Sequence, residues 1–128
     1  MSNVYFIQSE TYVKIGFTEG DVTDRLAQLQ TGNPHSLRIM AVIPDALPTL
    51  EGLFHTVFMD ARYNGEWFRI TRELRKVIVL IANGARPHTA DAIAELRRFK
   101  PHRDMDRAHG HEFALPSARM VGLRSRRA

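Results

Sequence analysis

Two short apolar runs near the N-terminus constrain the fold more than any other feature of this chain. They are "NVYFIQ" (3–8) and "YVKIGF" (12–17), both rich in β-branched and aromatic residues. Only the three residues "SET" separate them. Runs of this composition joined by so short a connection predict a β-hairpin.

The hairpin also predicts which side chains share a side of the sheet. Alternate residues of a strand point to opposite faces, so Val13 and Ile15 should point one way and Lys14 and Gly16 the other. If the apolar set faces the helices, Tyr5 of the first strand should emerge beside Lys14.

The remaining pattern predicts four helices and one or two more strands. Asp21 and Thr89 are expected N-caps, and Gly32 and Gly84 are expected helix stops. In chain order we expect a helix over 21–32, a strand over 36–43, a helix over 47–63 with an apolar stripe, a short strand over 65–70, and helices over 71–84 and 90–100. This order predicts an α/β fold, a small antiparallel sheet (the hairpin plus one or two further strands) flanked by helices.

Size and composition favour one small intracellular domain. The chain has 128 residues and no cysteine, which excludes a disulfide framework and a thiolate metal site. It has neither an apolar run of about 18 residues nor a signal-peptide pattern, so we expect a cytoplasmic protein without a membrane partner. We divide it into a domain over 1–85, an additional helix over 86–100 and a basic, flexible tail over 101–128.

The basic residues are concentrated at the C-terminus. Residues 1–96 carry nine Lys and Arg against eleven Asp and Glu, whereas residues 97–128 carry nine against three. Eight of the latter nine are arginines, whose planar guanidinium can bind two phosphate oxygens at once. The C-terminal segment is therefore either a phosphate-binding arm or a solubilising tail.

The first candidate site lies on the hairpin. Tyr5 and Lys14 should share a face, and Gly16 beside them should leave room for a bulky anion. Arg25, early in the next helix, could reach the same space, which would make a phosphodiester site. The alternative is that Lys14 extends from a half-buried strand to solvent while Arg25 lies on a solvated helix face.

The second candidate site lies on the helix over 47–63. Glu51 and His55 are i, i+4 neighbours, and Arg62 continues their line along the edge of the apolar stripe. A carboxylate there suits Mg²⁺ or Mn²⁺, which combines one or two protein carboxylates with water and phosphate oxygens. His55 could carry a proton or orient Glu51. An ordinary helical Glu–His pair is the alternative.

The segment "YNGEWF" (63–68) forms a third cluster. Asn64 and Gly65 indicate a turn, and Trp67 and Phe68 should pack in the core. Glu66 and Asn64 would lie at the mouth of the site, where they either contact substrate or cap the turn.

Together these segments resemble the GIY-YIG nuclease superfamily, and more closely its compact branch from phage and other viral genomes. Five elements in the same order carry the resemblance over residues 3 to about 80: "VYFIQ" (4–8), "VKIGFT" (13–18), Arg25, "EGLFH" (51–55) and "GEWF" (65–68). The resemblance implies a small α/β domain that hydrolyses DNA phosphodiesters with one divalent metal ion.

The resemblance also implies roles for individual residues. Tyr5 matches the tyrosine of the first motif, Lys14 and Gly16 match the opening residue and the glycine of the second, and Arg25 matches the helix arginine. Glu51 matches the metal-binding glutamate. Lys14 stands where the founding pattern has a tyrosine. For the late asparagine of the family, Asn64 is nearest in this sequence and Glu66 is a possible substitute.

In the implied mechanism Glu51 holds the metal ion and Arg25 neutralises charge on the phosphate. The proton acceptor is left open among Tyr5, Lys14 and His55.

Two other functions remain open at this stage, a nucleic-acid-binding module with a vestigial site and a protein-interaction domain of a phage or mobile element. If the chain is a nuclease, one compact site cuts one strand, so double-strand cleavage would require a homodimer or two sequential nicks.

Overall fold

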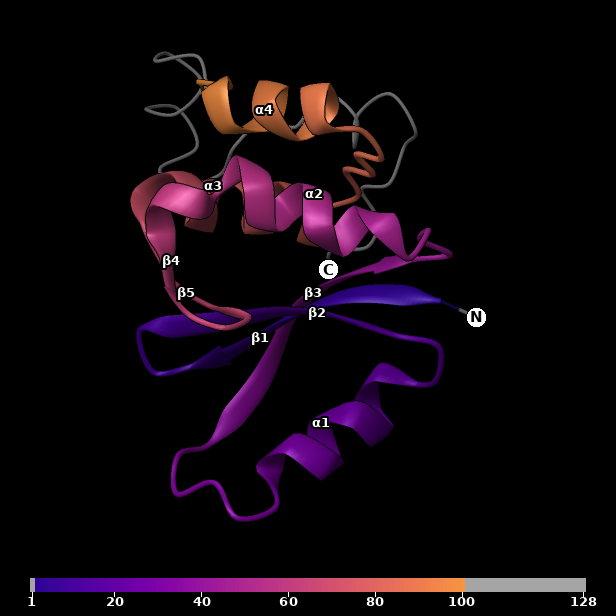
Figure 1. The fold of residues 1–128 in the computed structure, drawn as a ribbon, viewed down its shortest axis with the longest axis vertical. Helices are drawn as coiled ribbons and strands as arrows, with labels where there is room; N and C mark the ends of the chain where they lie inside the picture. Colours follow the sequence, from indigo (N-terminus) through magenta and orange to yellow (C-terminus); the bar gives the residue numbers. More distant parts are fainter. Residues whose placement is uncertain (1, 101–128) are drawn as a thin grey trace.

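A five-stranded antiparallel sheet with helices on both faces forms the molecule (Figure 1). The computed structural model describes residues 2–100. The strands, β1 (Asn3–Ser9), β2 (Tyr12–Thr18), β3 (Leu37–Pro44), β4 (Arg62–Asn64) and β5 (Trp67–Arg69), lie in the order β3-β1-β2-β5-β4. The helices are α1 (Val22–Gln30), α2 (Thr49–Val57), α3 (Arg72–Ala82) and α4 (Ala90–Arg98), with a 3-10 segment η1 (Met59–Ala61). The predicted fold class is confirmed.

The predicted hairpin is β1–β2, and its register places the candidate side chains as expected. Tyr5 lies opposite Gly16, and Ile7 lies opposite Lys14. Residues that are partners across an antiparallel pair point to the same face. Tyr5, Lys14 and Gly16 therefore share one face of the sheet, as the alternation predicted.

Each face of the sheet has its own hydrophobic cluster. Helix α1 covers one face, α2 and α3 cover the other, and α4 lies on the outer side of α2 and α3 (Figure 1). The smaller cluster, beneath α1, has as its buried members Tyr5, Ile7, Val22 and Leu37. The larger cluster includes Val4, Phe6, Val13, Ile15, Phe54, Phe58, Phe68, Leu74, Ile78 and Ile93.

Local chemistry sets most helix ends. The side chains of Asp21, Thr71 and Thr89 each accept a hydrogen bond from a first-turn backbone N–H of α1, α3 and α4. Gly32 and Gly84, which follow the ends of α1 and α3, have φ values of 77° and 116°. This left-handed region strains other residues, so both glycines stop their helices as predicted.

The predicted helix over 47–63 is too long. Helix α2 ends at Val57, and the 3-10 segment Met59–Ala61 leads into strand Arg62–Asn64. That strand pairs with Trp67–Arg69 across the turn at Gly65, where φ is 58°. The hairpin pairing requires extended backbone at Arg62, so it overrides the helical period of the sequence. Arg62 therefore does not continue the line of Glu51 and His55 on α2.

Helix α4 packs on the domain. Ile93 is fully buried in the larger cluster. The Arg97 guanidinium donates to both carboxylate oxygens of Asp60, at 3.0 and 2.6 Å, and to the Val57 carbonyl at 2.7 Å. Lys76 of α3 donates to the carbonyls of Arg97 and Phe99. The predicted basic tail, 101–128, lies outside the described residues. Across residues 2–100, no helix combines the length and apolar character needed to cross a membrane.

Candidate active site

The Tyr5 ring lies across Gly16, and this contact explains the glycine. A Cβ atom built on Gly16 would lie 2.3 Å from the Tyr5 Oη and 2.4 Å from its Cζ. Tyr5 is completely buried. The expectation that Gly16 leaves room for an anion is therefore wrong, because the phenol ring fills that space.

Arg25 is held against this tyrosine from α1. Its Nε donates to the Tyr5 Oη at 3.4 Å, and its Nη1 donates to the Gln28 Oε1 at 3.2 Å. The hydrogen bond to Tyr5 raises the pKa of Arg25 above its usual value, and the nearby Glu66 carboxylate contributes in the same direction. The guanidinium is half-buried and remains charged.

Lys14 is paired with Glu66. Its Nζ lies 3.0 Å from the Glu66 Oε1, and only 15% of its side chain is exposed. The same Nζ lies 5.7 Å from the centre of the Trp67 ring. Glu66 is fixed by its backbone, because its carbonyl accepts from the Ile15 N–H at 3.0 Å, next to the pairing of β2 with β5.

His55 attaches α2 to the hairpin. Its Nε2 lies 2.9 Å from the Ile15 carbonyl oxygen and 3.7 Å from the Glu51 Oε2. A carbonyl only accepts, so the contact with Ile15 requires the hydrogen on Nε2. The ring also contacts Phe68, with centroids 4.9 Å apart. His55 therefore fixes the side of α2 that carries Glu51.

Glu51 and Glu66 form a carboxyl pair. Burial, together with the hydrogen bond to Glu66 and its negative charge, raises the pKa of Glu51 to about 7, against the opposing effect of Lys14. Burial also acts to raise the pKa of Glu66, but the hydrogen bonds from Glu51 and Lys14 outweigh it and the net shift is downward. Below about pH 7 the pair therefore holds one proton, and Glu51 carries it.

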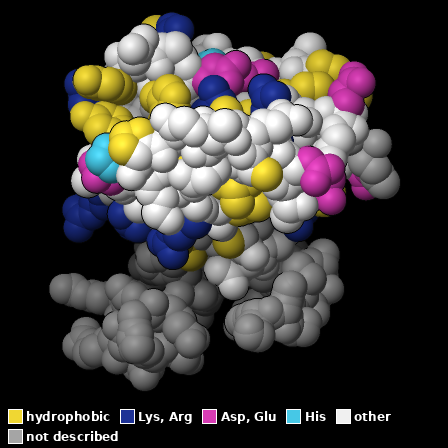
Figure 2. Space-filling view, turned by 90° about the horizontal axis from the view of Figure 1, so that it is seen from below, with side chains coloured by type: hydrophobic (Ala, Val, Ile, Leu, Met, Phe, Trp, Pro, Cys, Tyr) yellow, Lys and Arg dark blue, Asp and Glu magenta, His cyan; other side chains and the backbone are white. Residues whose placement is uncertain are grey.

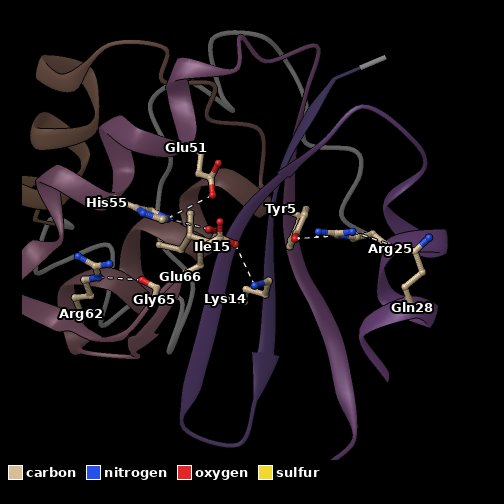
Figure 3. Close-up of polar contacts among 10 residues, drawn as sticks. All are labelled: Tyr5, Lys14, Ile15, Arg25, Gln28, Glu51, His55, Arg62, Gly65 and Glu66. Carbon is tan, nitrogen blue, oxygen red and sulfur yellow. Dashed lines mark hydrogen bonds and ion pairs between the residues drawn. The ribbon is translucent and has the colours of Figure 1, made fainter. Parts of the chain in front are cut away.

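Glu66 connects the two faces of the sheet. Figure 3 shows Glu51 and His55 on one side of the hairpin and Tyr5 with Arg25 on the other. Lys14 and Glu66 lie between them and are joined by the ion pair. Glu51, His55, Glu66 and Lys14 are thus in one continuous network, and the Tyr5–Arg25 pair borders it across the strands.

Two predicted substrate-binding residues lie outside this network. Arg62 is exposed on β4, and its Nε donates to the Gly65 carbonyl at 2.9 Å. Asn64 is exposed opposite Trp67 in the β4–β5 hairpin. Both stabilise or flank the turn. The sequence analysis expected Glu66 at the mouth of the site. It did not predict the contacts of Glu66 with Lys14 and Glu51, because these three residues come from separate segments of the chain and no local sequence pattern indicates that they meet.

The donor atoms of the network suit a hard divalent cation. Within residues 2–100, no group of three or more His, Asp or Glu side chains is placed to hold a metal ion. Tetrahedral zinc sites require three or four protein ligands, so the chemistry does not match zinc. Mg²⁺ commonly uses one or two carboxylates and keeps waters. A divalent cation bound between Glu51 and Glu66 would replace the proton of the pair and would neutralise the repulsion between the two ionised carboxylates.

Comparison with known proteins identifies a matching family. The T5orf172 domain family matches residues 3–83, which include β1 to α3 and every candidate site residue. The domain is nuclease-associated and implies a nucleic-acid partner. Neither the curated proteins nor the solved structures that were searched gave a match.

Proposed function

Because this chain belongs to the T5orf172 domain family, we propose that it is a metal-dependent endonuclease of the GIY-YIG type, which hydrolyses DNA phosphodiester bonds. The observation that supports the proposal most is the carboxyl pair of Glu51 and Glu66 with the Lys14 ammonium 3.0 Å from Glu66. The two carboxyl groups would supply metal-binding oxygens and Lys14 would supply a phosphate-binding cation, close together beside the pairing of β2 with β5.

Glu51 would hold the metal ion, Mg²⁺ or Mn²⁺, with Glu66 as a second carboxylate beside it. When bound, the ion supplies Lewis-acid stabilisation of the charge that develops on the phosphate. Lys14 donates hydrogen bonds to a non-bridging phosphate oxygen, and Arg25 neutralises charge from the other side of the hairpin.

The three residues considered as proton acceptors are all engaged. The Tyr5 hydroxyl is buried and accepts from Arg25. His55 Nε2 faces the Ile15 carbonyl, and Lys14 is ion-paired with Glu66. Tyr5 and His55 therefore serve as positioning residues for Arg25 and Glu51. The Glu66 carboxylate, whose side chain is 42% exposed, accepts a hydrogen bond from the attacking water and orients it.

Nicking of supercoiled plasmid DNA tests this function. The full chain should convert supercoiled to open-circular DNA in Mg²⁺ or Mn²⁺ and should not do so in EDTA. Glu51→Gln keeps the shape of the side chain but removes its charge, so it should abolish nicking and leave DNA binding intact. Glu95→Gln, at an exposed position on α4, is the matched control and should nick as the wild type does.

A nucleic-acid-binding module is the second candidate function. The full burial of Tyr5 favours it, because a catalytic phenol would have to be reached by water. If clean wild-type protein retains DNA on a filter but never nicks it with either metal ion, the binding function replaces the nuclease.

A further inference from the structure

Helix α1 leaves part of its face of the sheet uncovered. It packs mainly on β3 and β1, at one side of the sheet. Strands β5 and β4 extend the sheet beyond β2 on the other side. Figure 2 views the molecule from the α1 side and shows hydrophobic side chains gathered at the upper left, beside a group of basic, acidic and histidine side chains.

The strand register identifies the side chains of this uncovered part. Tyr12 is the partner of Arg69, and Lys14 is the partner of Trp67. Partners in an antiparallel pair lie on one face, and Tyr12 and Lys14 are two residues apart in β2. These four side chains therefore line the face that carries Tyr5 and Gly16.

Tyr63 of β4 completes an aromatic surface. Its ring centroid lies 4.6 Å from that of Tyr12, and the Arg69 Cζ lies 5.9 Å from the Tyr63 ring. Tyr63 is 56% exposed, and within residues 2–100 it is one of three large hydrophobic side chains with exposure this high. We call Tyr12, Tyr63, Trp67 and Arg69 the aromatic platform.

The aromatic platform is continuous with the candidate active site. The Lys14 Nζ lies 5.7 Å from the Trp67 ring and 3.0 Å from Glu66. A strand of DNA with a phosphate at Lys14 would therefore have its neighbouring nucleotides beside Trp67 and Tyr63.

We propose that the aromatic platform binds unpaired nucleotides of a DNA substrate next to the phosphate that the site holds. This inference rests on the proposed function and specifies its substrate class as DNA with a single-stranded segment, such as a flap or a gap. An exposed aromatic ring stacks on any base, and arginine binds the backbone. Bases in an intact duplex are already stacked and cannot lie on the platform. The basic and aromatic character of the surface suits a nucleic acid strand.

Binding to matched oligonucleotides tests the proposal. Trp67 is the one tryptophan of the chain, so its fluorescence reports directly on the platform. A duplex with a short single-stranded flap should quench this fluorescence and should bind more tightly than the blunt duplex of equal length. Tyr63→Ala should weaken flap binding roughly five- to a hundredfold with little effect on the blunt duplex. Tyr63→Phe should retain the binding.

Two control variants alter similar side chains elsewhere. Leu47→Ala removes another exposed hydrophobic side chain, 67% exposed. Arg38→Ala removes an exposed arginine on the other face of the sheet from the aromatic platform. Arg38 is the strand partner of Gln8, which points away from the face shared by Ile7 and Lys14. Neither should change the preference for the flap.

The proposal and the proposed function fail separately. If the protein nicks DNA but binds flap and blunt duplex equally, or if Tyr63→Ala binds as the wild type does, the platform proposal is overturned and the nuclease stands. If flap DNA quenches Trp67 and Tyr63→Ala loses this binding while no substrate is nicked, the platform stands without the nuclease.

Discussion

Replacing Gly16 with alanine should destabilise the protein through a steric clash with Tyr5. The added Cβ would lie 2.3, 2.4 and 2.8 Å from the Oη, Cζ and Cε1 atoms of Tyr5, where ordinary contacts begin near 3.4 Å. The ring has no room to retreat, because Tyr5 is fully buried beneath α1. Overpacking of this kind costs about 1–3 kcal/mol, and three short contacts place this site toward the upper end.

Urea or thermal unfolding measures this cost. For a domain of this size a loss of 1 kcal/mol lowers Tm by about 4–8 °C, so Gly16→Ala should lower it by about 10 °C or more. Gly52→Ala is the matched control, since its Cβ would meet nothing within 4 Å. Gly52 lies inside α2, so alanine there should stabilise the fold by about 0.5–1 kcal/mol.

A double-mutant cycle tests the reason for the loss. Tyr5→Leu shortens the side chain that the new methyl group would strike, so adding Gly16→Ala to that variant should cost much less than in the wild type. If alanine at position 16 costs the same in both backgrounds, or costs nothing in the wild type, the ring contact does not explain the glycine.

Other predictions concern charge. The pKa of Glu51 is raised from 4.5 to about 7 in the folded protein. The protonated Glu51 side chain therefore adds to the free energy of unfolding in full below about pH 4.5, and this contribution is lost as pH rises through 7. The resulting change in the free energy of unfolding is at most about 3 kcal/mol and is reduced by the opposite pKa shift of Glu66. A plot of Tm against pH should therefore be flatter for Glu51→Gln than for the wild type. Equal slopes for the two proteins would contradict this prediction. Mg²⁺ should raise Tm of the wild type more at pH 8 than at pH 5 and leave Glu51→Gln unchanged, as thermal scans with and without EDTA would show. Arg97→Ala should lower the free energy of unfolding, measured in urea, by about 1 kcal/mol, because the hydrogen bonds to Val57 and to the largely exposed Asp60 are lost. Arg98 is exposed on the same helix, so Arg98→Ala should change this free energy little.

The parts of the fold that follow from local chemistry were predictable. The alternation of the hairpin placed Tyr5 and Lys14 on one face, and the capping residues Asp21 and Thr89 marked the starts of their helices. These features depend on residues close together in the chain, so a sequence pattern records them directly.

The parts that depend on distant segments were not predictable. The apolar stripe from Leu50 to Ala61 has a helical period, yet the chain leaves the helix after Val57 because the β4–β5 hairpin requires extended backbone. Likewise, Gly16 indicates a close approach, but only the register shows that the Tyr5 ring makes it. The pairing of Glu51 with Glu66 depends on how that hairpin docks beside α2, for which the residues themselves carry no signal.

Helix α4 lies beyond the family match, which ends at residue 83, yet it is bonded to the end of the helix that carries Glu51. A chain cut after residue 85 would keep every candidate catalytic side chain but would uncover the apolar surface around Val57 and Phe58, over which Arg97 lies. The Arg97 bonds at the C-terminal end of α2 would then be lost, and its inclination over the hairpin would depend on its core packing and on the contact of His55 with the Ile15 carbonyl. Truncation to the matched residues would thus loosen the alignment of the acidic pair without removing a single reactive atom.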